Sequence, residues 1–142
     1  MPQRFFPPFS VGANVSNQAI TDAFRCKNIG GIRYSTATKT IVLILNYNFG
    51  IYDNSSNADD GEFYFAGEGQ EGDQCMNRGN LRLNNAAADG IELHLFESLV
   101  NDPGYRYRGT VETIGEPSVE RQADKNGNER NVFMFKLRRC KQ

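Results

Sequence analysis

The chain has 142 residues, of which 39% are hydrophobic and 23% are charged, and its formal net charge is −1. This size and composition are typical of one soluble globular domain that buries a core without disulfides or metals. The near-neutral charge argues against a general polyanion binder, and no apolar stretch approaches the roughly 20 residues that span a bilayer. We therefore expect an intracellular protein with a single domain over residues 1–142.

The cysteines and the histidine limit the chemistry that is available. Cys26, Cys75 and Cys140 are far apart and form no CxxC pair, so we expect reduced thiols rather than a zinc site or a disulfide. The single histidine, His94, argues against a multi-histidine metal site or a Ser-His triad. Because His94 alternates with apolar neighbours, we expect it at a strand edge or facing solvent. The sequence predicts no catalytic residue, no metal and no cofactor.

The first third of the chain predicts an arm, a helix and a buried strand. Three prolines exclude a helix from residues 1–13, and three phenylalanines there can fix the arm to the body. Residues 14–24 show apolar side chains at helical spacing, with a polar cap at Ser16 or Asn17. Residues 40–45, TIVLIL, are a continuous apolar run, which predicts a strand buried on both faces.

The middle of the chain predicts a strand, a glycine turn and a helix. Residues 62–66 predict an aromatic strand whose two phenylalanines share one face, and residues 67–69 predict a tight turn. We expect a helix that is capped by Asp73, reaches about Ala88 and stops at an Asp-Gly pair. Gly79 inside that helix lowers its stability by roughly 1 kcal/mol relative to alanine, which close packing on the sheet would offset.

The last third of the chain predicts strands joined by turns. The expected strands are residues 91–96, 105–114 and 131–137, and the expected turns are residues 101–104 and 124–128. Several strands follow each other with only a turn between them, and two helices accompany them. This order predicts an α+β fold, a twisted, mixed and mostly antiparallel β-barrel with two flanking helices.

Nine short motifs occur together in one order along the chain. They are GGIRYS (30–35), IVLIL (41–45), IYDN (51–54), FAGEG (65–69), GDQ (72–74), RGNLRL (78–83), ELHLFE (92–97), YRGTVE (107–112) and FKLRR (135–139). The set resembles the SRA family (SET- and RING-associated, also called YDG) of modified-DNA readers. It is most similar to the bacterial SRA-like domain found upstream of HNH nuclease domains in modification-dependent restriction endonucleases. The likeness runs from about Phe24 to Arg139.

The resemblance implies a PUA-like β-barrel that grips duplex DNA. A modified cytosine, with 5-methylcytosine or 5-hydroxymethylcytosine as the expected base, would be swung out of the helix into a pocket. Extruding a base costs a few kcal/mol of unstacking, which stacking on aromatic rings and hydrogen bonds to the base edge recover. The long basic finger loop of vertebrate members has no counterpart after the glycine turn, so we do not expect the opposite strand to be read in that way.

The resemblance also implies a base pocket made of Tyr52, Asp53, Phe65, Ala66 and Gly67. Tyr52 and Phe65 match the two aromatic residues that stack on the flipped base, and Asp53 is the first choice for the base-reading acid. Ala66 stands where the family has a threonine that hydrogen-bonds the base, so backbone would have to replace that contact. From the residues alone, an ordinary turn at Tyr52-Asp53 and core packing of Phe65 are the simpler interpretations.

Five residues are candidates for phosphate contact. Arg33, Tyr34 and Ser35 follow a double glycine, and Arg106 and Arg108 share one face of an expected strand. Arginine and hydroxyl groups are the usual partners of phosphate, and two arginines on one strand face can follow a DNA backbone. The alternatives are an ordinary exposed arginine at position 33 and ion pairs of the other two arginines with Glu112 or Glu120.

We expect a non-catalytic recognition module for double-stranded DNA with modified bases, fused to or partnered with a nuclease domain or subunit. Its expected location is the bacterial or archaeal cytoplasm, in association with the nucleoid and not with a membrane. Two other functions remain open. A PUA-like RNA-binding module would prefer single-stranded RNA. A small barrel hydrolase would use the acids between Asp53 and Asp73 and would be active without a nuclease partner.

Overall fold

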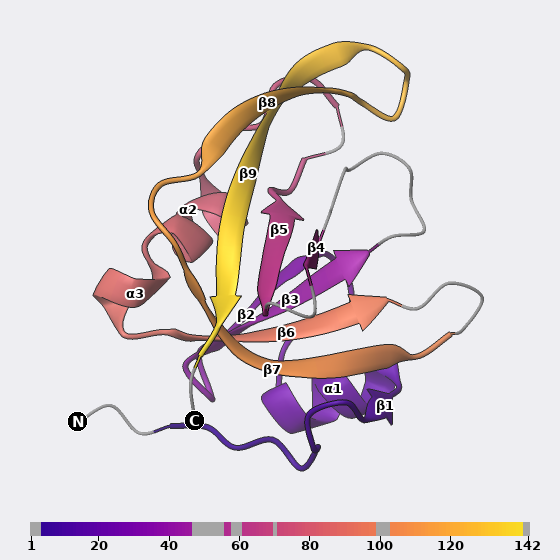
Figure 1. Ribbon diagram of the computed structural model, residues 1–142. Helices are drawn as coiled ribbons and strands as arrows, with labels where there is room; N and C mark the ends of the chain where they lie inside the picture. The colour runs from indigo at the N-terminus through magenta and orange to yellow at the C-terminus, as the bar shows by residue number, and fades with distance from the viewer. Residues whose placement is uncertain (1–3, 47–55, 58–60, 70, 99–102, 141–142) are drawn as a thin grey trace.

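The computed structural model describes residues 4–46, 56–57, 61–69, 71–98 and 103–140. In these ranges a mixed sheet curls into a half-barrel, α1 covers its lower side, α2 and α3 lie at one flank, and the β8–β9 hairpin rises at the top (Figure 1). The strands are β1 (Asn14–Val15), β2 (Ile32–Ser35), β3 (Thr40–Asn46), β4 (Ser56–Asn57), β5 (Glu62–Ala66), β6 (Glu92–Ser98), β7 (Tyr105–Thr113), β8 (Ser118–Ala123) and β9 (Glu129–Arg139). The helices are α1 (Asn17–Phe24), α2 (Arg78–Asn84) and α3 (Ala86–Asp89).

The sheet is mixed and mostly antiparallel, as the sequence predicts. Its strand order is β2-β3-β6-β7-β9-β5-β4, with β1 paired to β7 and β8 paired to β9. Among the described strands, β3 and β6 make the one parallel pair, in which Thr40 lies opposite Glu92. The predicted α+β fold with a mixed, mostly antiparallel sheet is therefore confirmed, and the predicted barrel takes the form of a curled half-barrel.

Strand β3 is buried on both faces, which confirms the prediction from its continuous apolar run. Ile41, Leu43 and Leu45 join the core inside the half-barrel. Val42 and Ile44 join a second cluster that α1 covers with two of its side chains. Full burial of such a side chain stabilises the fold by about 1.5–3 kcal/mol, so this strand anchors both layers.

The N-terminal arm is fixed by two of its three phenylalanines. The ring centroids of Phe5 and Phe9 lie 4.9 and 6.5 Å from that of Phe24 in α1. Phe6 is 77% exposed and takes no part in this packing. The arm thus closes the cluster beneath the sheet, on the side away from the inner core.

Helix α1 begins later than predicted. Ser16 is its N-cap, and the Ser16 hydroxyl accepts the N–H of Ala19 at 3.0 Å, which is the geometry expected of a serine cap. Asn14 and Val15 are outside the helix because they pair with β7 as the short strand β1. The cap was therefore identified correctly, and the two residues before it were taken up by the sheet.

The predicted helix from Asp73 to Ala88 is wrong in its first part. The helices observed are α2 and α3, and the residues before them are bonded to β9 instead. The carboxylate of Asp73 accepts the N–H of Asn131 at 2.7 Å, and the N–H of Gln74 donates to the carbonyl of Asn131 at 3.0 Å. Because these groups are held by a neighbouring strand, Asp73 cannot serve as the helix cap.

The expectation that His94 lies at a strand edge or faces solvent is also wrong. His94 is completely buried, with Nδ1 2.8 Å from the Tyr107 hydroxyl and Nε2 2.8 Å from Glu92 Oε1. Its ring also makes an edge contact with Phe24, at a centroid distance of 4.9 Å. A histidine can occupy an interior position when both ring nitrogens have partners, and its alternation with apolar residues reflects that burial.

The sequence does not predict β8, because its residues are polar and exposed on nearly all sides. A strand without a buried face has no alternation to detect. The turn predicted at residues 124–128 is confirmed, since Asp124 Oδ1 accepts the N–H groups of Asn126 and Asn128, each at 2.9 Å. The turn predicted at residues 101–104 falls partly outside the described residues.

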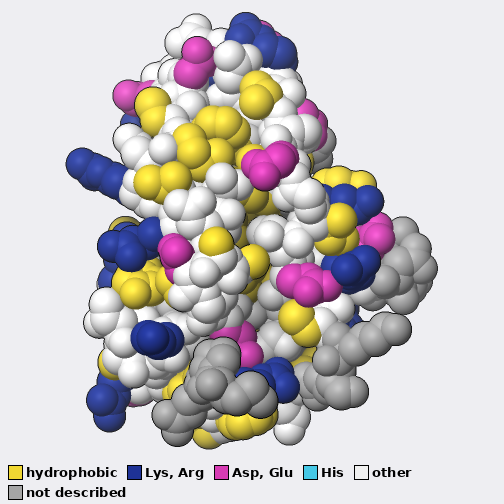
Figure 2. Space-filling view, turned by 90° about the vertical axis from the view of Figure 1, so that its left-hand side faces the viewer, with side chains coloured by type: hydrophobic (Ala, Val, Ile, Leu, Met, Phe, Trp, Pro, Cys, Tyr) yellow, Lys and Arg dark blue, Asp and Glu magenta, His cyan; other side chains and the backbone are white. Residues whose placement is uncertain are grey.

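Figure 2 shows the face on which α2 and α3 lie. Apolar side chains gather in its upper half, toward the β8–β9 hairpin, and side chains of both charges are scattered around them. Val119 of β8 is 59% exposed and Leu81 of α2 is 42% exposed. None of the described helices is long and apolar enough to cross a membrane.

Candidate nucleic-acid interface

A cavity of about 830 Å³ lies between the Gly30-Gly31 loop, the end of β5 and the segment that leads into α2. Its apolar lining comes from Ile32, Ile44 and Phe65, which are largely buried. Glycine backbone and polar side chains, among them Glu68, make up much of the remaining wall. A cavity of this size lies within the range that holds drug-sized ligands, so it has room for a nucleobase.

Three of the five predicted pocket residues line this cavity. Phe65 is 2% exposed, and a Cβ placed on Gly31 would lie 3.7 Å from the tip of its ring. Ala66 is 5% exposed, and Gly67 is buried beside it. The Phe65 ring therefore belongs to the core, and its tip reaches the space beside the double glycine.

The other two predicted pocket residues, Tyr52 and Asp53, lie outside the described residues. The expectation that the rings of Tyr52 and Phe65 face each other across a cavity therefore stays a prediction. The same holds for Asp53 as the base-reading acid.

Buried polar side chains hold the glycine turn that forms one side of the cavity. Gln74 is 8% exposed, and its Nε2 donates to the carbonyl of Gly67 at 2.6 Å while its Oε1 accepts the N–H of Phe133 at 2.9 Å. Asn80 is 2% exposed, and its amide bonds both the N–H and the carbonyl of Glu68, at 2.8 and 3.1 Å. Side chains that satisfy backbone groups in this way fix the conformation of a turn.

Arg130 holds the other end of the same turn. It is 1% exposed, and its Nη1 donates to the carbonyls of Gly69 and Gly72 at 2.6 and 3.1 Å. Sequence reasoning missed Arg130, Gln74 and Asn80 as site residues. The GDQ and RGN motifs contain two of them, but nothing in the pattern indicates that these polar side chains point inward.

Two glycines are required by this arrangement. A Cβ on Gly67 would lie 2.7 Å from Gln74 Oε1 and 2.8 Å from Asn80 Oδ1, closer than such atoms approach. A Cβ on Gly79 would overlap the carboxylate of Glu68, whose Oε1 accepts the N–H of Gly79 at 3.1 Å. Gly79 therefore makes room for Glu68 and not, as expected, for the sheet.

Arg33 is buried, with 3% of its surface exposed. Its Nε donates to the carbonyl of Gly30 at 2.9 Å, and its Nη1 donates to Asn17 Oδ1 at 2.6 Å, so it ties the cavity loop to α1. Burial lowers the pKa of Arg33 below its ordinary value. Because so little of its surface is exposed, the guanidinium is poorly placed to reach a phosphate, and that contact stays a prediction.

Tyr34 and Ser35 are also engaged within the protein. The guanidinium carbon of Arg82 lies 4.1 Å from the centre of the Tyr34 ring, a cation–π contact. Ser35 is 1% exposed, and its hydroxyl accepts the N–H of Thr38 at 3.2 Å. Neither side chain is presented freely to solvent, and their contacts with phosphate likewise stay predictions.

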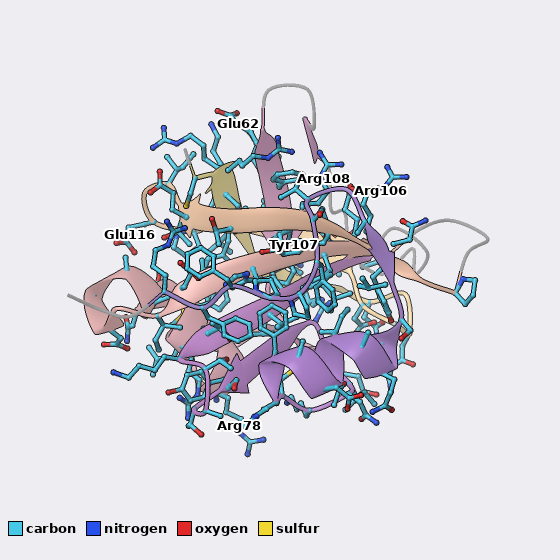
Figure 3. The ribbon with its side chains drawn as sticks, turned by 90° about the horizontal axis from the view of Figure 1, so that it is seen from below. Glu62, Arg78, Arg106, Tyr107, Arg108 and Glu116 are labelled. Atoms are coloured by element: carbon cyan, nitrogen blue, oxygen red, sulfur yellow. The ribbon has the colours of Figure 1, made fainter. Side chains whose placement is uncertain are left out.

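Arg106 and Arg108 project from β7, and Tyr107 between them points into the protein (Figure 3). Arg106 is exposed. Arg108 is half-buried, with its Nη1 2.9 Å from Glu97 Oε1 and its guanidinium 5.5 Å from the centre of the Phe63 ring. The partner of Arg108 is therefore Glu97 and not Glu112 or Glu120, as the alternative interpretation expected, and Arg106 is the more accessible arginine.

Three exposed residues at the edge of the cavity were not identified from the sequence. Arg78 lines the cavity and adopts a left-handed backbone conformation, with φ at 46°, and it projects outward at a distance from Arg106 (Figure 3). The side chain of Lys27 lies against Gly30. Ile29 also lines the cavity and is 72% exposed. They are scattered in the sequence, so no local pattern marks them.

Within the described ranges, no three His, Cys, Asp or Glu side chains are grouped so as to hold a metal ion. The three cysteines are not joined to one another in the structure, and Cys26 is buried. The cavity offers an apolar wall, fixed backbone groups and two acidic side chains, Glu68 and Asp73, of which Asp73 already accepts the N–H of Asn131. Such a lining can hold a flat heterocycle and form hydrogen bonds to its edge.

Over residues 11–142 the sequence matches the profile of the family described as ScoMcrA-like, SRA domain. The chain belongs to this SRA domain family. The predicted resemblance is thereby confirmed at the level of the family. A search of curated proteins finds no match.

The fold is similar to SRA domains in solved structures. The sulfur-binding and SRA domains of ScoMcrA, complexed with phosphorothioated DNA, give a TM-score of 0.75 at 17% identity over 94% of this chain. The SUVH5 SRA domain with hemi-methylated CG DNA gives 0.71 at 19% identity, covering all of this chain and 96% of that one. This chain spans 40% of the ScoMcrA fragment and 28% of the phosphorothioation-dependent restriction endonuclease ScoMcrA, whose TM-score is 0.76.

Proposed function

We propose that this SRA domain binds duplex DNA that carries a modified base, with 5-methylcytosine or 5-hydroxymethylcytosine as the expected ligand. The base would leave the helix and enter the cavity beside Phe65. The domain would be the recognition module of a modification-dependent restriction system, and a separate nuclease domain or subunit would cut the DNA. The observation that carries the proposal is a preorganised cavity of about 830 Å³ in a chain of this family.

The lining of the cavity supports base capture. Phe65 provides an aromatic ring, and the turn from Gly67 to Gly69 provides backbone groups held in place by buried side chains. Because Ala66 replaces the threonine expected from the family, a turn carbonyl, which can accept a second hydrogen bond, would take over the contact with the base. The solved SRA structures with methylated DNA agree with this class of ligand.

Ile29 is suited to fill the gap that an extruded base leaves in the duplex. It is a large apolar residue, 72% exposed, on the edge of the cavity. Proteins that deform DNA often insert apolar side chains between base steps. The matched control is Val119, which is 59% exposed on β8 and does not line the cavity.

Arg78, Lys27 and Arg106 would provide the phosphate contacts. They are exposed, and Arg78 and Lys27 border the cavity. Each contact with phosphate releases about one counterion, so replacing one of these residues with glutamine should reduce the salt dependence of binding by about one unit of slope. Such variants should weaken modified and unmodified duplexes about equally.

The direct test is binding of matched duplexes at fixed salt. One duplex is unmodified, and the others carry 5-methylcytosine, 5-hydroxymethylcytosine, N6-methyladenine or a phosphorothioate linkage. A preference for a modified cytosine is expected. Equal affinity for all of them at every salt concentration would refute the proposal, and a preference for the phosphorothioate alone would move recognition from the base to the backbone.

Variants test the position of the base. Phe65→Ala would leave a core cavity that costs about 3–5 kcal/mol, so Phe65→Leu is the better variant. Loss of stacking should weaken binding of the modified duplex by roughly 1–3 kcal/mol in Phe65→Leu and in Tyr52→Ala. Ile29→Ala should lower the fluorescence gain of a 2-aminopurine placed next to the modified base, and Val119→Ala should not. Unchanged binding and fluorescence in folded variants would place the base elsewhere.

A further inference from the structure

Glu68 is a half-buried carboxylate on the cavity wall, and the proposed function does not yet use it. Its Oε1 accepts the N–H of Gly79 at 3.1 Å. Its main-chain N–H and carbonyl are both bonded to the Asn80 side chain, at 2.8 and 3.1 Å. Among the described residues, its second oxygen, Oε2, accepts no hydrogen bond. The carboxylate is therefore held in place with one oxygen available.

This carboxylate has no cation to neutralise it within the described ranges, where the ion pairs involve other acids. Duplex DNA carries one negative charge for about every 1.7 Å of its axis, so a carboxylate near it is unfavourable unless it faces a hydrogen-bond donor. Glu68 Oε1 has such a donor in the Gly79 N–H, and Oε2 is suited to a donor that the ligand brings.

A cytosine ring brings such a donor. Its exocyclic N4 amino group is a donor that thymine lacks, and glutamate and aspartate are the side chains that accept from it. We propose that Glu68 Oε2 accepts the N4–H of the flipped, modified cytosine and is a specificity-determining acid of this pocket. This inference rests on the proposed function, because it requires the base to enter the cavity. It assigns the base-reading acid to the glycine turn rather than only to Asp53.

Glu68 also has a structural role, because its Oε1 bonds the first turn of α2 through Gly79. The variant Glu68→Gln separates the two roles. A glutamine oxygen can still accept the N–H of Gly79, while the amide NH₂ then replaces Oε2 and meets the cytosine amino group donor to donor. The fold should be retained and the reading of the amino group lost.

The experiment compares two duplexes that differ only at the target base. One carries 5-methylcytosine, and the other carries 5-methylpyrimidin-2-one, which keeps the ring, the methyl group, N3 and O2 but has no exocyclic amino group. Each base is placed opposite an abasic site, so neither has to be unpaired. The protein should bind 5-methylcytosine roughly tenfold to a hundredfold more tightly, as expected for a hydrogen bond to a charged group. In the Glu68→Gln variant, the ratio of the affinities for the two duplexes should fall to about one to three.

Glu71→Gln is the matched control. Glu71 is exposed on the segment that follows the turn, does not line the cavity, and pairs with Lys125 at 3.0 Å. The Glu71→Gln variant removes the same charge near the DNA and should keep the wild-type ratio of affinities for the two duplexes. An unchanged ratio in Glu68→Gln, or an equal fall in Glu71→Gln, would overturn the role of Glu68.

The outcomes also separate this inference from the proposed function. If the protein prefers modified over unmodified duplexes but binds both analogues equally, Glu68 does not read the amino group and the proposed function stands. If it is indifferent to every modification, both are overturned. Urea unfolding of Glu68→Gln checks that its fold is retained.

Discussion

Gly79→Ala tests whether Glu68 is held at the start of α2 as the structure shows. In an ordinary helix this substitution stabilises by up to about 1 kcal/mol. Here the new methyl group would overlap the Glu68 carboxylate and break its hydrogen bond to the Gly79 N–H. Losing a hydrogen bond to a charged group costs about 1.5–3 kcal/mol, so the net effect should be a destabilisation of roughly 0.5–2 kcal/mol.

Urea unfolding measures this effect, and a second variant gives its control. In a Glu68→Ala background the overlap is absent, so Gly79→Ala should become neutral or stabilising. The two substitutions should therefore show an interaction energy of roughly 1–3 kcal/mol in a double-mutant cycle. If Gly79→Ala stabilises the otherwise unchanged protein, the contact between Glu68 and Gly79 is not made in solution.

Three further predictions follow from the buried polar groups. Tyr107→Phe leaves Nδ1 of the buried His94 without its partner and should lower the free energy of unfolding by about 1–3 kcal/mol. Tyr64→Phe, at a half-exposed ring of β5, should change the free energy of unfolding little. The hydrogen bond from that histidine holds the pKa of Glu92 below its ordinary value of 4.5. The stabilisation that this bond gives the fold is therefore present above pH 4.5 and is lost as the pH falls through the folded-state pKa of Glu92. Glu92→Gln should flatten the acid side of the stability profile, and an unchanged profile would contradict the assignment. Arg130→Met removes the guanidinium hydrogen bonds to the carbonyls of Gly69 and Gly72, and it should both destabilise the fold by about 1–3 kcal/mol and weaken binding of modified DNA. Arg121→Met, on the exposed face of β8, should do neither.

The elements that the sequence predicts well are those with a buried face. The apolar run of β3 and the aromatic strand β5 were predicted with nearly the observed bounds, because burial imposes a period on the residue types. Strand β8 has no buried face and was missed. The helix start at Asp73 was wrong because an acid before a helical pattern predicts a cap, whereas Asp73 bonds a strand that is distant in sequence.

The residues of the site also differ in whether a local sequence pattern marks them. Phe65, Ala66 and Gly67 were placed in the pocket through motifs that are contiguous in sequence, and they do line the cavity. Arg33 looked like a surface residue because charged side chains usually are exposed. Its burial depends on an acceptor in α1 and a carbonyl of the neighbouring loop. Long-range partners of this kind leave no local signature.

The buried polar residues around the glycine turn indicate what this part of the fold is built to specify. Gln74, Asn80 and Arg130 bond main-chain groups of a single turn, where apolar side chains would give a core of comparable stability at a smaller desolvation cost. Their effect is to fix the conformation of the turn, since each satisfied bond removes an alternative arrangement. A turn that is fixed so strongly beside an open cavity holds the Glu68 main chain in one position, and the Gly79 N–H holds one oxygen of its carboxylate. A carboxylate that is held in place discriminates against a wrong base more strongly than a mobile one, because it cannot turn away to relieve the unfavourable contact.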